Sequence, residues 1–228
     1  MRPGPIDAAV TRVKVCCIAS VDEARLAAAH GAAALGLVSA MPSGPGVIAD
    51  ERIAEIAAAL RGQPQRTFLL TARTRAEAIA AQHAAAGTTT LQLVDHVPHA
   101  ELRQLRALCP DVELVQVIHV AGAASIDEAL AAAPFVDALL LDSGNPALAV
   151  KELGGTGRTH DWALSRRIRD AVFPLPLWLA GGLRVHNVGA AIAAVQPYGL
   201  DLCTGVRSEG RLDAEKLDSF MQAVRAAS

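Results

Sequence analysis

The chain alternates between short apolar runs and longer alanine-rich segments whose polar residues recur at helical spacing. This alternation predicts eight strands, at Val13–Ile18, Ala33–Val38, Arg66–Thr71, Thr88–Val94, Val112–Val117, Val136–Leu141, Leu175–Ala180 and Leu200–Cys203. Each strand precedes one predicted helix, at Asp22–His30, Asp50–Leu60, Arg75–Ala86, Ala100–Leu108, Ser125–Ala132, Asp161–Ala171, His186–Val195 and Asp213–Ala226. Ser20 is placed to cap the first helix, and Gly31 lies just past its end.

Eight strand–helix units with short links favour a single (β/α)8 TIM barrel of the α/β class over an open sheet. Apolar runs such as 138–141 are typical of parallel strands that are buried on both sides. The rival fold, a doubly wound sheet, usually carries GxGxxG after its first strand, whereas this chain has Cys16-Cys17-Ile18-Ala19 there. No linker interrupts the pattern, so residues 1–228 are expected to form one domain.

Composition narrows the function classes. The net charge is −2 and aromatic residues make up 3%, which argues against a nucleic-acid partner. No apolar run approaches the ~20 residues that a membrane helix needs, and residues 1–11 lack the apolar core of a signal peptide. The four cysteines show no metal-ligand or disulfide spacing, which favours a reducing cytoplasm as the location of the protein. They are Cys16, Cys17, Cys109 and Cys203.

Glycine-rich segments follow each of the last three predicted strands. They contain Gly154–Gly157 (with Gly155 and Gly157), Gly181 with Gly182, and Thr204 with Gly205. Barrels often hold a phosphate with the loops after strands 7 and 8, where main-chain N–H groups approach the anion. Turns also need glycine, but three such sets at one end of a barrel favour a phosphate-binding site.

Two residues at strand ends are candidates for acid–base chemistry. Cys16 ends the first strand, and Asp142 follows the sixth after a run of apolar residues. A thiolate can remove a carbon-bound proton and a carboxylic acid can protonate a leaving oxygen, while Lys14, on the same strand face, would favour the thiolate. The alternative for a cysteine in a strand is a small buried apolar residue.

Asp201, in the last strand, can bind a ligand amine or hydroxyl, or pair with a basic side chain. Other polar residues near strand ends match no zinc or iron spacing, so no metal is expected: Asp95, His96, His119 and His160.

At these residues the sequence resembles phosphoribosylanthranilate isomerases. The first βαβ unit, Val13 to Gly36, is similar to that family's opening, which contains Lys-Ile-Cys-Gly-Ile. The second half follows the family pattern in order, through 139–143, Gly154–Gly157, Asp161-Trp162, 179–183, Asn187-Val188, 197–201 and Gly205-Val206. The resemblance is specific from about Leu139 onward and weak between Gly62 and Leu130.

The resemblance implies a cofactor-free Amadori rearrangement of an aminoribose 5-phosphate in tryptophan biosynthesis. It assigns the general base to Cys16, the general acid to Asp142 and a ligand contact to Asp201. It assigns phosphate binding to main-chain groups at Gly155, Gly157, Gly181, Gly182, Thr204 and Gly205. The expected partner is a small sugar phosphate, with no nucleic acid and no membrane, and the chain would be a monomer or homodimer.

Several positions depart from the family pattern. Cys17 replaces a glycine, Cys203-Thr204 replaces Ser-Ser, and Arg207 replaces an acidic residue. The loop 41–46 carries no cation, although the family has an arginine there for the anthranilate carboxylate. Arg207 is a candidate to reach the ligand in its place. The alternatives are therefore a divergent isomerase of another sugar phosphate and a non-catalytic barrel that binds a phosphorylated ligand.

Overall fold

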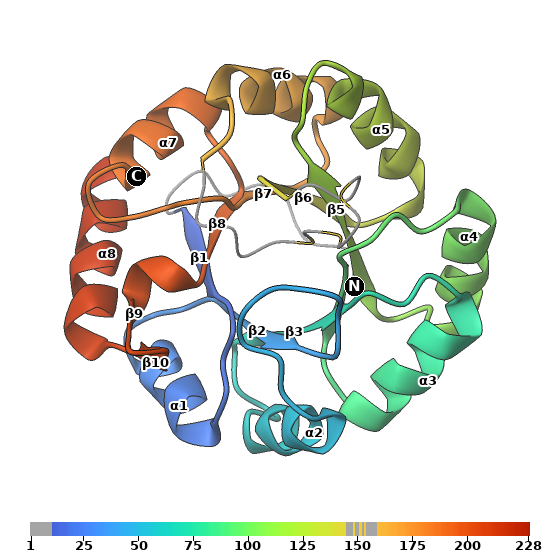
Figure 1. Ribbon diagram of the computed structural model, residues 1–228, viewed down its shortest axis with the longest axis horizontal. Helices are drawn as coiled ribbons and strands as arrows, with labels where there is room; N and C mark the ends of the chain where they lie inside the picture. Colours follow the sequence, from blue (N-terminus) through green and yellow to red (C-terminus); the bar gives the residue numbers. More distant parts are fainter. Residues whose placement is uncertain (1–10, 145–147, 149–150, 152, 154–158) are drawn as a thin grey trace.

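A computed structural model describes residues 11–144, 148, 151, 153 and 159–228. Eight parallel strands close into a barrel, and the main helices form a ring around it (Figure 1). The strands are β1 (Arg12–Val15), β2 (Ala34–Val38), β3 (Arg66–Thr71), β4 (Thr90–Leu93), β5 (Glu113–His119), β6 (Ala138–Asp142), β7 (Leu177–Leu179) and β8 (Gly199–Leu202). The helices are α1 (Val21–Ala29), α2 (Asp50–Ala59), α3 (Ala76–Ala86), α4 (His99–Leu108), α5 (Ala124–Ala132), α6 (Trp162–Val172), α7 (Val188–Val195) and α8 (Ala214–Ala227).

Strand β1 closes the barrel because it pairs with β2 on one side and with β8 on the other. In the β1–β8 ladder Lys14 lies opposite Asp201, and Val15 lies opposite Leu202. The (β/α)8 barrel expected from the sequence is therefore confirmed. Parallel pairing places the carboxyl ends of all eight strands at one face, where barrel active sites are built.

Two apolar layers hold the barrel together. The larger fills the space between strands and helices, with members such as Leu35 and Ile53 fully buried. The smaller fills the barrel interior, where the rings of Phe68 and Trp178 meet edge to face at a centroid distance of 5.8 Å. A Cβ at Gly199 would lie 2.5 Å from the Trp178 ring, so glycine at this position gives the indole its room.

Local capping follows the sequence. Ser20 accepts a hydrogen bond from the backbone N–H of Glu23 at 3.1 Å, and Gly31 follows the helix with a φ of +90°. Strand β1 ends at Val15, so Cys16 directly follows the strand instead of lying within it.

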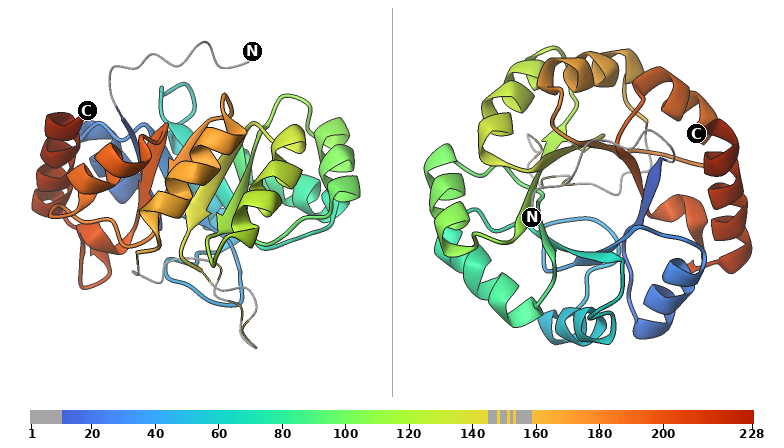
Figure 2. Two further views of the ribbon diagram at one scale, coloured as in Figure 1. Left: turned by 90° about the horizontal axis from the view of Figure 1, so that it is seen from above. Right: turned by 180° about the vertical axis from the view of Figure 1, so that it is seen from behind.

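The stretch between β8 and α8, for which the sequence predicted neither helix nor strand, contains regular structure. It contains a short 3-10 helix, η2 (Thr204–Val206), and a hairpin of β9 (Arg207–Ser208) and β10 (Arg211–Leu212). Figure 2 shows this hairpin and the loop after β2 on the same side of the barrel. Glu23 holds the hairpin against α1 by accepting hydrogen bonds from Leu212 N–H and from the Arg207 guanidinium.

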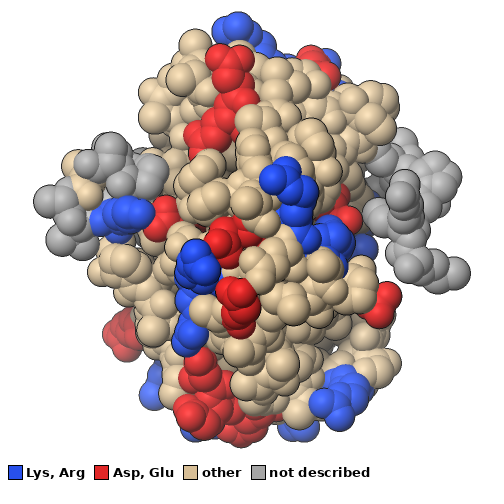
Figure 3. All heavy atoms as spheres, turned by 90° about the vertical axis from the view of Figure 1, so that its right-hand side faces the viewer, with Lys and Arg blue, Asp and Glu red and all other residues tan. Residues whose placement is uncertain are grey.

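The face drawn in Figure 3 carries interspersed acidic and basic side chains. In the described part of the chain, no helix is long and apolar enough to cross a membrane.

Candidate active site

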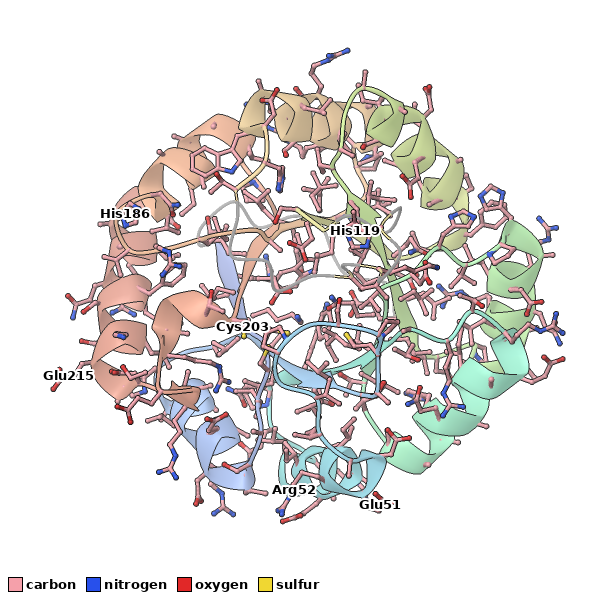
Figure 4. All side chains as sticks on the ribbon, in the orientation of Figure 1. Glu51, Arg52, His119, His186, Cys203 and Glu215 are labelled. Atoms are coloured by element: carbon pink, nitrogen blue, oxygen red, sulfur yellow. The ribbon has the colours of Figure 1, made fainter. Side chains whose placement is uncertain are left out.

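A pocket of about 660 Å³, measured with its open mouth, lies at the carboxyl ends of the strands. Strands far apart in sequence supply its walls, because Cys16 follows β1, Gln92 lies in β4, Asp142 ends β6 and Asp201 lies in β8. In Figure 4 the labelled Cys203 lies near the barrel axis, whereas Glu51 and Glu215 lie at the periphery. The pocket thus brings together the two residues expected to perform acid–base chemistry.

The thiol of Cys16 shares its surroundings with a buried ammonium. A Cβ at Gly36 would lie 2.8 Å from the Cys16 Sγ and 3.0 Å from the Lys14 Nζ, so both side chains end beside this glycine. Lys14 Nζ is 2.8 Å from the Oδ2 of Asp201. Burial alone would lower the pKa of Lys14, but the Asp201 carboxylate and the neighbouring thiols hold that pKa above its usual value. Lys14 is therefore a permanent cation next to Cys16.

Asp142 is nearly fully buried, with 9% of the residue exposed. Burial raises the pKa of its carboxyl above the usual value, and the opposing hydrogen bond from the Ser143 N–H does not cancel the effect. A raised carboxyl pKa keeps a proton available at higher pH, as a general acid requires.

The loop after β7 forms one wall of the pocket where the sequence predicts phosphate binding. Gly181 and Gly182 line the pocket with φ values of +87° and +60°, in the left-handed region that favours glycine. Within the described residues, no hydrogen bond occupies their N–H groups. The side chain of Asn187 fixes the loop, since it donates to the Gly182 carbonyl at 3.0 Å and accepts from Arg184 N–H at 2.8 Å. Helix α7 begins directly after Asn187 and points its N-terminus toward this loop.

The segment after β8 forms the facing wall, where Thr204 and Gly205 also line the pocket. A Cβ at Gly205 would lie 2.5 Å from the Leu183 carbonyl oxygen, so only glycine fits between the two walls. Gly155 and Gly157, expected to contribute a third wall, lie outside the described residues.

Two buried oxygen atoms belong to residues that line the pocket. Among the described residues, neither the Oδ1 of Asp201 nor the Oε1 of Gln92 has a hydrogen-bond partner. A buried acceptor without a donor is costly, so both atoms are suited to ligand hydroxyl or amine groups. Of the two roles expected for Asp201, the structure shows the ion pair, which it forms with Lys14. Gln92 was not predicted from the sequence as a site residue. Its polar side chain between the apolar residues Leu91 and Leu93 was the available signal.

Arg207 occupies a different place from the one expected. Its guanidinium donates to both carboxylate oxygens of Glu23 at 3.1 and 3.2 Å and to the carbonyl oxygens of Cys16 and Cys17. Arg207 does not line the pocket. In the structure Arg207 thus supports the backbone that follows β1, whereas the sequence suggested a contact with the ligand.

Fold and site are those of an enzyme of the (β/α)8 class, with a thiol and a buried carboxyl in one pocket at the strand ends. Comparison with known proteins narrows this class. Residues 13–223 match the family model described as N-(5'phosphoribosyl)anthranilate (PRA) isomerase. The chain therefore belongs to the phosphoribosylanthranilate isomerase family.

Individual relatives agree with this assignment over almost the whole chain. The N-(5'-phosphoribosyl)anthranilate isomerase of Methanocella arvoryzae is 33% identical over 217 residues, covering 95% of this chain and 99% of the relative. Isomerase 1 of Methanosarcina mazei is 32% identical and covers 96% of each chain. The crystal structure of the Thermus thermophilus isomerase is 26% identical, with a TM-score of 0.80, covering 96% of this chain and 100% of that one.

Proposed function

We propose that this protein isomerises N-(5'-phosphoribosyl)anthranilate, or a close analogue, to the corresponding 1-amino-1-deoxyketose phosphate in tryptophan biosynthesis. The observation that carries the proposal is a single pocket in which Cys16, Asp142 and the glycine cradle of 181–182 and 205 meet. The family match over residues 13–223 supports the same activity.

The cradle orients the substrate. The N–H groups of Gly181 and Gly182, with the segment around Gly205, hold the phosphate at the β7–β8 side of the pocket. The sugar then extends over the barrel axis, where the unpartnered oxygens of Asp201 and Gln92 accept hydrogen bonds from its hydroxyl or amine groups.

The chemistry needs one acid and one base. Asp142, whose pKa is raised by burial, acts as the general acid and gives a proton to the ring oxygen as the C1–O bond breaks and a protonated Schiff base forms. Cys16, beside the Lys14 ammonium, removes the C2 proton as a thiolate, and the resulting enolamine tautomerises to the ketone. The overall change is an isomerisation, so no external oxidant or reductant takes part.

A second candidate substrate is a sugar phosphate whose other end is uncharged. Met41, Gly44 and Pro45 bring the loop after β2 into the pocket wall, and this loop has no cation to pair with an anthranilate carboxylate. Within the described residues, the main-chain carbonyl of Lys151 accepts a hydrogen bond from Ser43 of this loop, while the Lys151 ammonium pairs with Asp95. Lower turnover of phosphoribosylanthranilate than of an analogue without the carboxylate would favour this candidate.

The direct test is turnover of phosphoribosylanthranilate by the purified protein and its variants. Cys16→Ala and Asp142→Asn should each lower kcat by about 10²–10⁴-fold, the usual effect of removing a general base or acid. Cys109→Ala is the matched control, because Cys109 is a buried cysteine at the end of α4 and outside the pocket.

Folding of each variant is checked by circular dichroism, and its cradle by titration with inorganic phosphate. Folded variants with near-full turnover would show that the assignment of base and acid is wrong. Phosphate binding without turnover of either substrate would instead favour a non-catalytic ligand-binding barrel.

Two further proposals concern the protein as a whole. We propose that it acts in the cytoplasm as one domain, since free thiols line its pocket and eight units close one barrel. A monomer and a homodimer are both compatible with this proposal, and sedimentation velocity distinguishes them.

A further inference from the structure

The loop 41–46 forms the pocket wall on the β2 side of Cys16. Met41, Gly44 and Pro45 of this loop line the pocket, and no residue of the loop carries a charge. Figure 1 shows the loop at the opening of the barrel, beside β2 and β3. Strand β1 pairs with β8 on one side and with β2 on the other, so Cys16, which follows β1, lies between this wall and the glycine cradle after β7 and β8.

The order of these walls assigns the two ends of the substrate. In the proposed reaction, on which this assignment rests, Cys16 removes the C2 proton while the cradle holds the phosphate on C5. The sugar chain therefore runs from the β8 side past Cys16, and the group on the C1 nitrogen extends to the β2 side. The loop 41–46 is then the wall that this group contacts.

Cys17 anchors the end of this loop. Its thiol donates a hydrogen bond to the Pro45 carbonyl, with an S–O distance of 3.6 Å. A Cβ at Gly46 would lie 2.4 Å from the Cys17 Cβ and 2.9 Å from its Sγ, so the loop backbone packs directly on this side chain. Cys17 is 5% exposed and itself lines the pocket. One side chain thus contacts two successive loop residues at the pocket wall.

The backbone at position 17 favours glycine over cysteine. Cys17 adopts a φ of +62°, in the left-handed region. This conformation destabilises the fold when the residue has a Cβ, whereas glycine adopts it freely. The cysteine side chain is therefore unfavourable for the local backbone, and its contribution lies in the contact with the loop.

We propose that Cys17 is a specificity-determining residue, which sets the position of the loop 41–46 and thereby the fit of the group on the C1 nitrogen. Cys17 acts through Pro45 and Gly46 and not on the reacting carbons, so it is a positioning residue. Because the loop presents Met41 and Pro45 and no charge, the group that it selects is a flat apolar ring.

The anchor is tested first on the free protein, without any ligand. Three variants dissect it: Cys17→Ser keeps a donor and the Cβ, Cys17→Ala keeps only the Cβ, and Cys17→Gly keeps neither but suits the left-handed backbone. Amide hydrogen exchange of the peptide that covers 41–46 should be about tenfold faster in Cys17→Gly than in the wild type and in Cys17→Ser, with Cys17→Ala between them. Urea unfolding should show that Cys17→Gly is about as stable as the wild type, because relief of the backbone offsets the lost contacts.

Specificity is then measured by isothermal titration with two unreactive ligands. The first, 1-(phenylamino)-1-deoxyribitol 5-phosphate, carries a ring on the C1 nitrogen, and the second, ribitol 5-phosphate, lacks it. Cys17→Ala should bind the ring-bearing ligand about 2- to 10-fold more weakly than the wild type, the effect of one neutral hydrogen bond, and Cys17→Gly at least as weakly. Cys17→Ser should stay within about twofold of the wild type, as should the matched control Cys109→Ala, which lies outside the pocket. All these variants should bind ribitol 5-phosphate as the wild type does.

A merely structural role for Cys17 would affect both ligands alike, with a loss of stability. The proposal is overturned if exchange of the loop is unchanged in Cys17→Gly, if the two ligands lose affinity equally, or if Cys17→Ser behaves like Cys17→Gly. Turnover of phosphoribosylanthranilate by the wild type separates this result from the proposed function. A folded protein that shows the selectivity for the ring but no turnover would refute the isomerase activity and support the anchor.

Discussion

The contact between the two walls of the phosphate cradle is tight enough to be tested by a single methyl group. In Gly205→Ala the new Cβ would lie 2.5 Å from the Leu183 carbonyl oxygen. This oxygen belongs to the backbone, so either η2 or the loop after β7 must move, and both line the pocket where we propose that phosphate binds. A hydrogen bond to a charged group contributes about 1.5–3 kcal/mol. Loss of one such bond should weaken phosphate binding about 10- to 150-fold.

Isothermal titration with inorganic phosphate and with ribose 5-phosphate measures this effect, and circular dichroism verifies the fold. Gly122→Ala is the matched control, because its Cβ would meet no atom within 4 Å and Gly122 lies outside the pocket. The control should stay within about twofold of the wild type. A folded Gly205→Ala protein that binds phosphate with wild-type affinity would refute the position of the cradle.

Two predictions concern pH. Because burial raises the pKa of Asp142, kcat should decline as pH rises through that pKa, and the stability contributed by the neutral carboxyl should be lost over the same range. Asp142→Asn should remove this decline from the pH–rate profile. The variant should also be more stable than the wild type at high pH, as urea unfolding would show. Hydrogen bonds from Arg207 and from the Leu212 and Ala19 N–H groups outweigh burial and lower the pKa of Glu23. At pH values above the usual glutamate pKa, Glu23→Gln should therefore lower the free energy of unfolding by about 1–2 kcal/mol. This difference should vanish as the pH falls through the lowered pKa of Glu23. Equal stability of Glu23→Gln and the wild type at neutral pH would contradict this.

Much of the fold could be predicted from the sequence because its signals are local. Most strands are short apolar runs, and α1 lies between the capping residues Ser20 and Gly31. The Lys14–Asp201 pair could also have been derived, because closing β8 onto β1 places the two residues directly opposite each other. The strands β9 and β10 have two residues each, too few to show any periodicity.

The positions of Cys16 and Asp142 in one pocket were predictable, because strand ends determine them. The site was not predictable where a contact joins distant segments. Arg207 and Glu23 are 184 residues apart, and no local pattern indicates that they meet. The raised pKa of Asp142 likewise arises from burial, which depends on how the whole barrel packs.

The departures from the family pattern around the first strand end are coupled to one another. A left-handed backbone costs a non-glycine residue about 1–2 kcal/mol, and Cys17 adopts it with a φ of +62°. Two neighbours make this conformation tolerable. Arg207 donates to the carbonyl oxygens of Cys16 and Cys17, and Gly46 has no Cβ, which would otherwise collide with the Cβ of Cys17. An acidic residue at 207 would face the same carbonyl oxygens and the Glu23 carboxylate, and would repel them. Cys17 and Arg207 are therefore best understood as one change in how the end of β1 is anchored, made while Cys16 keeps its place directly after the strand.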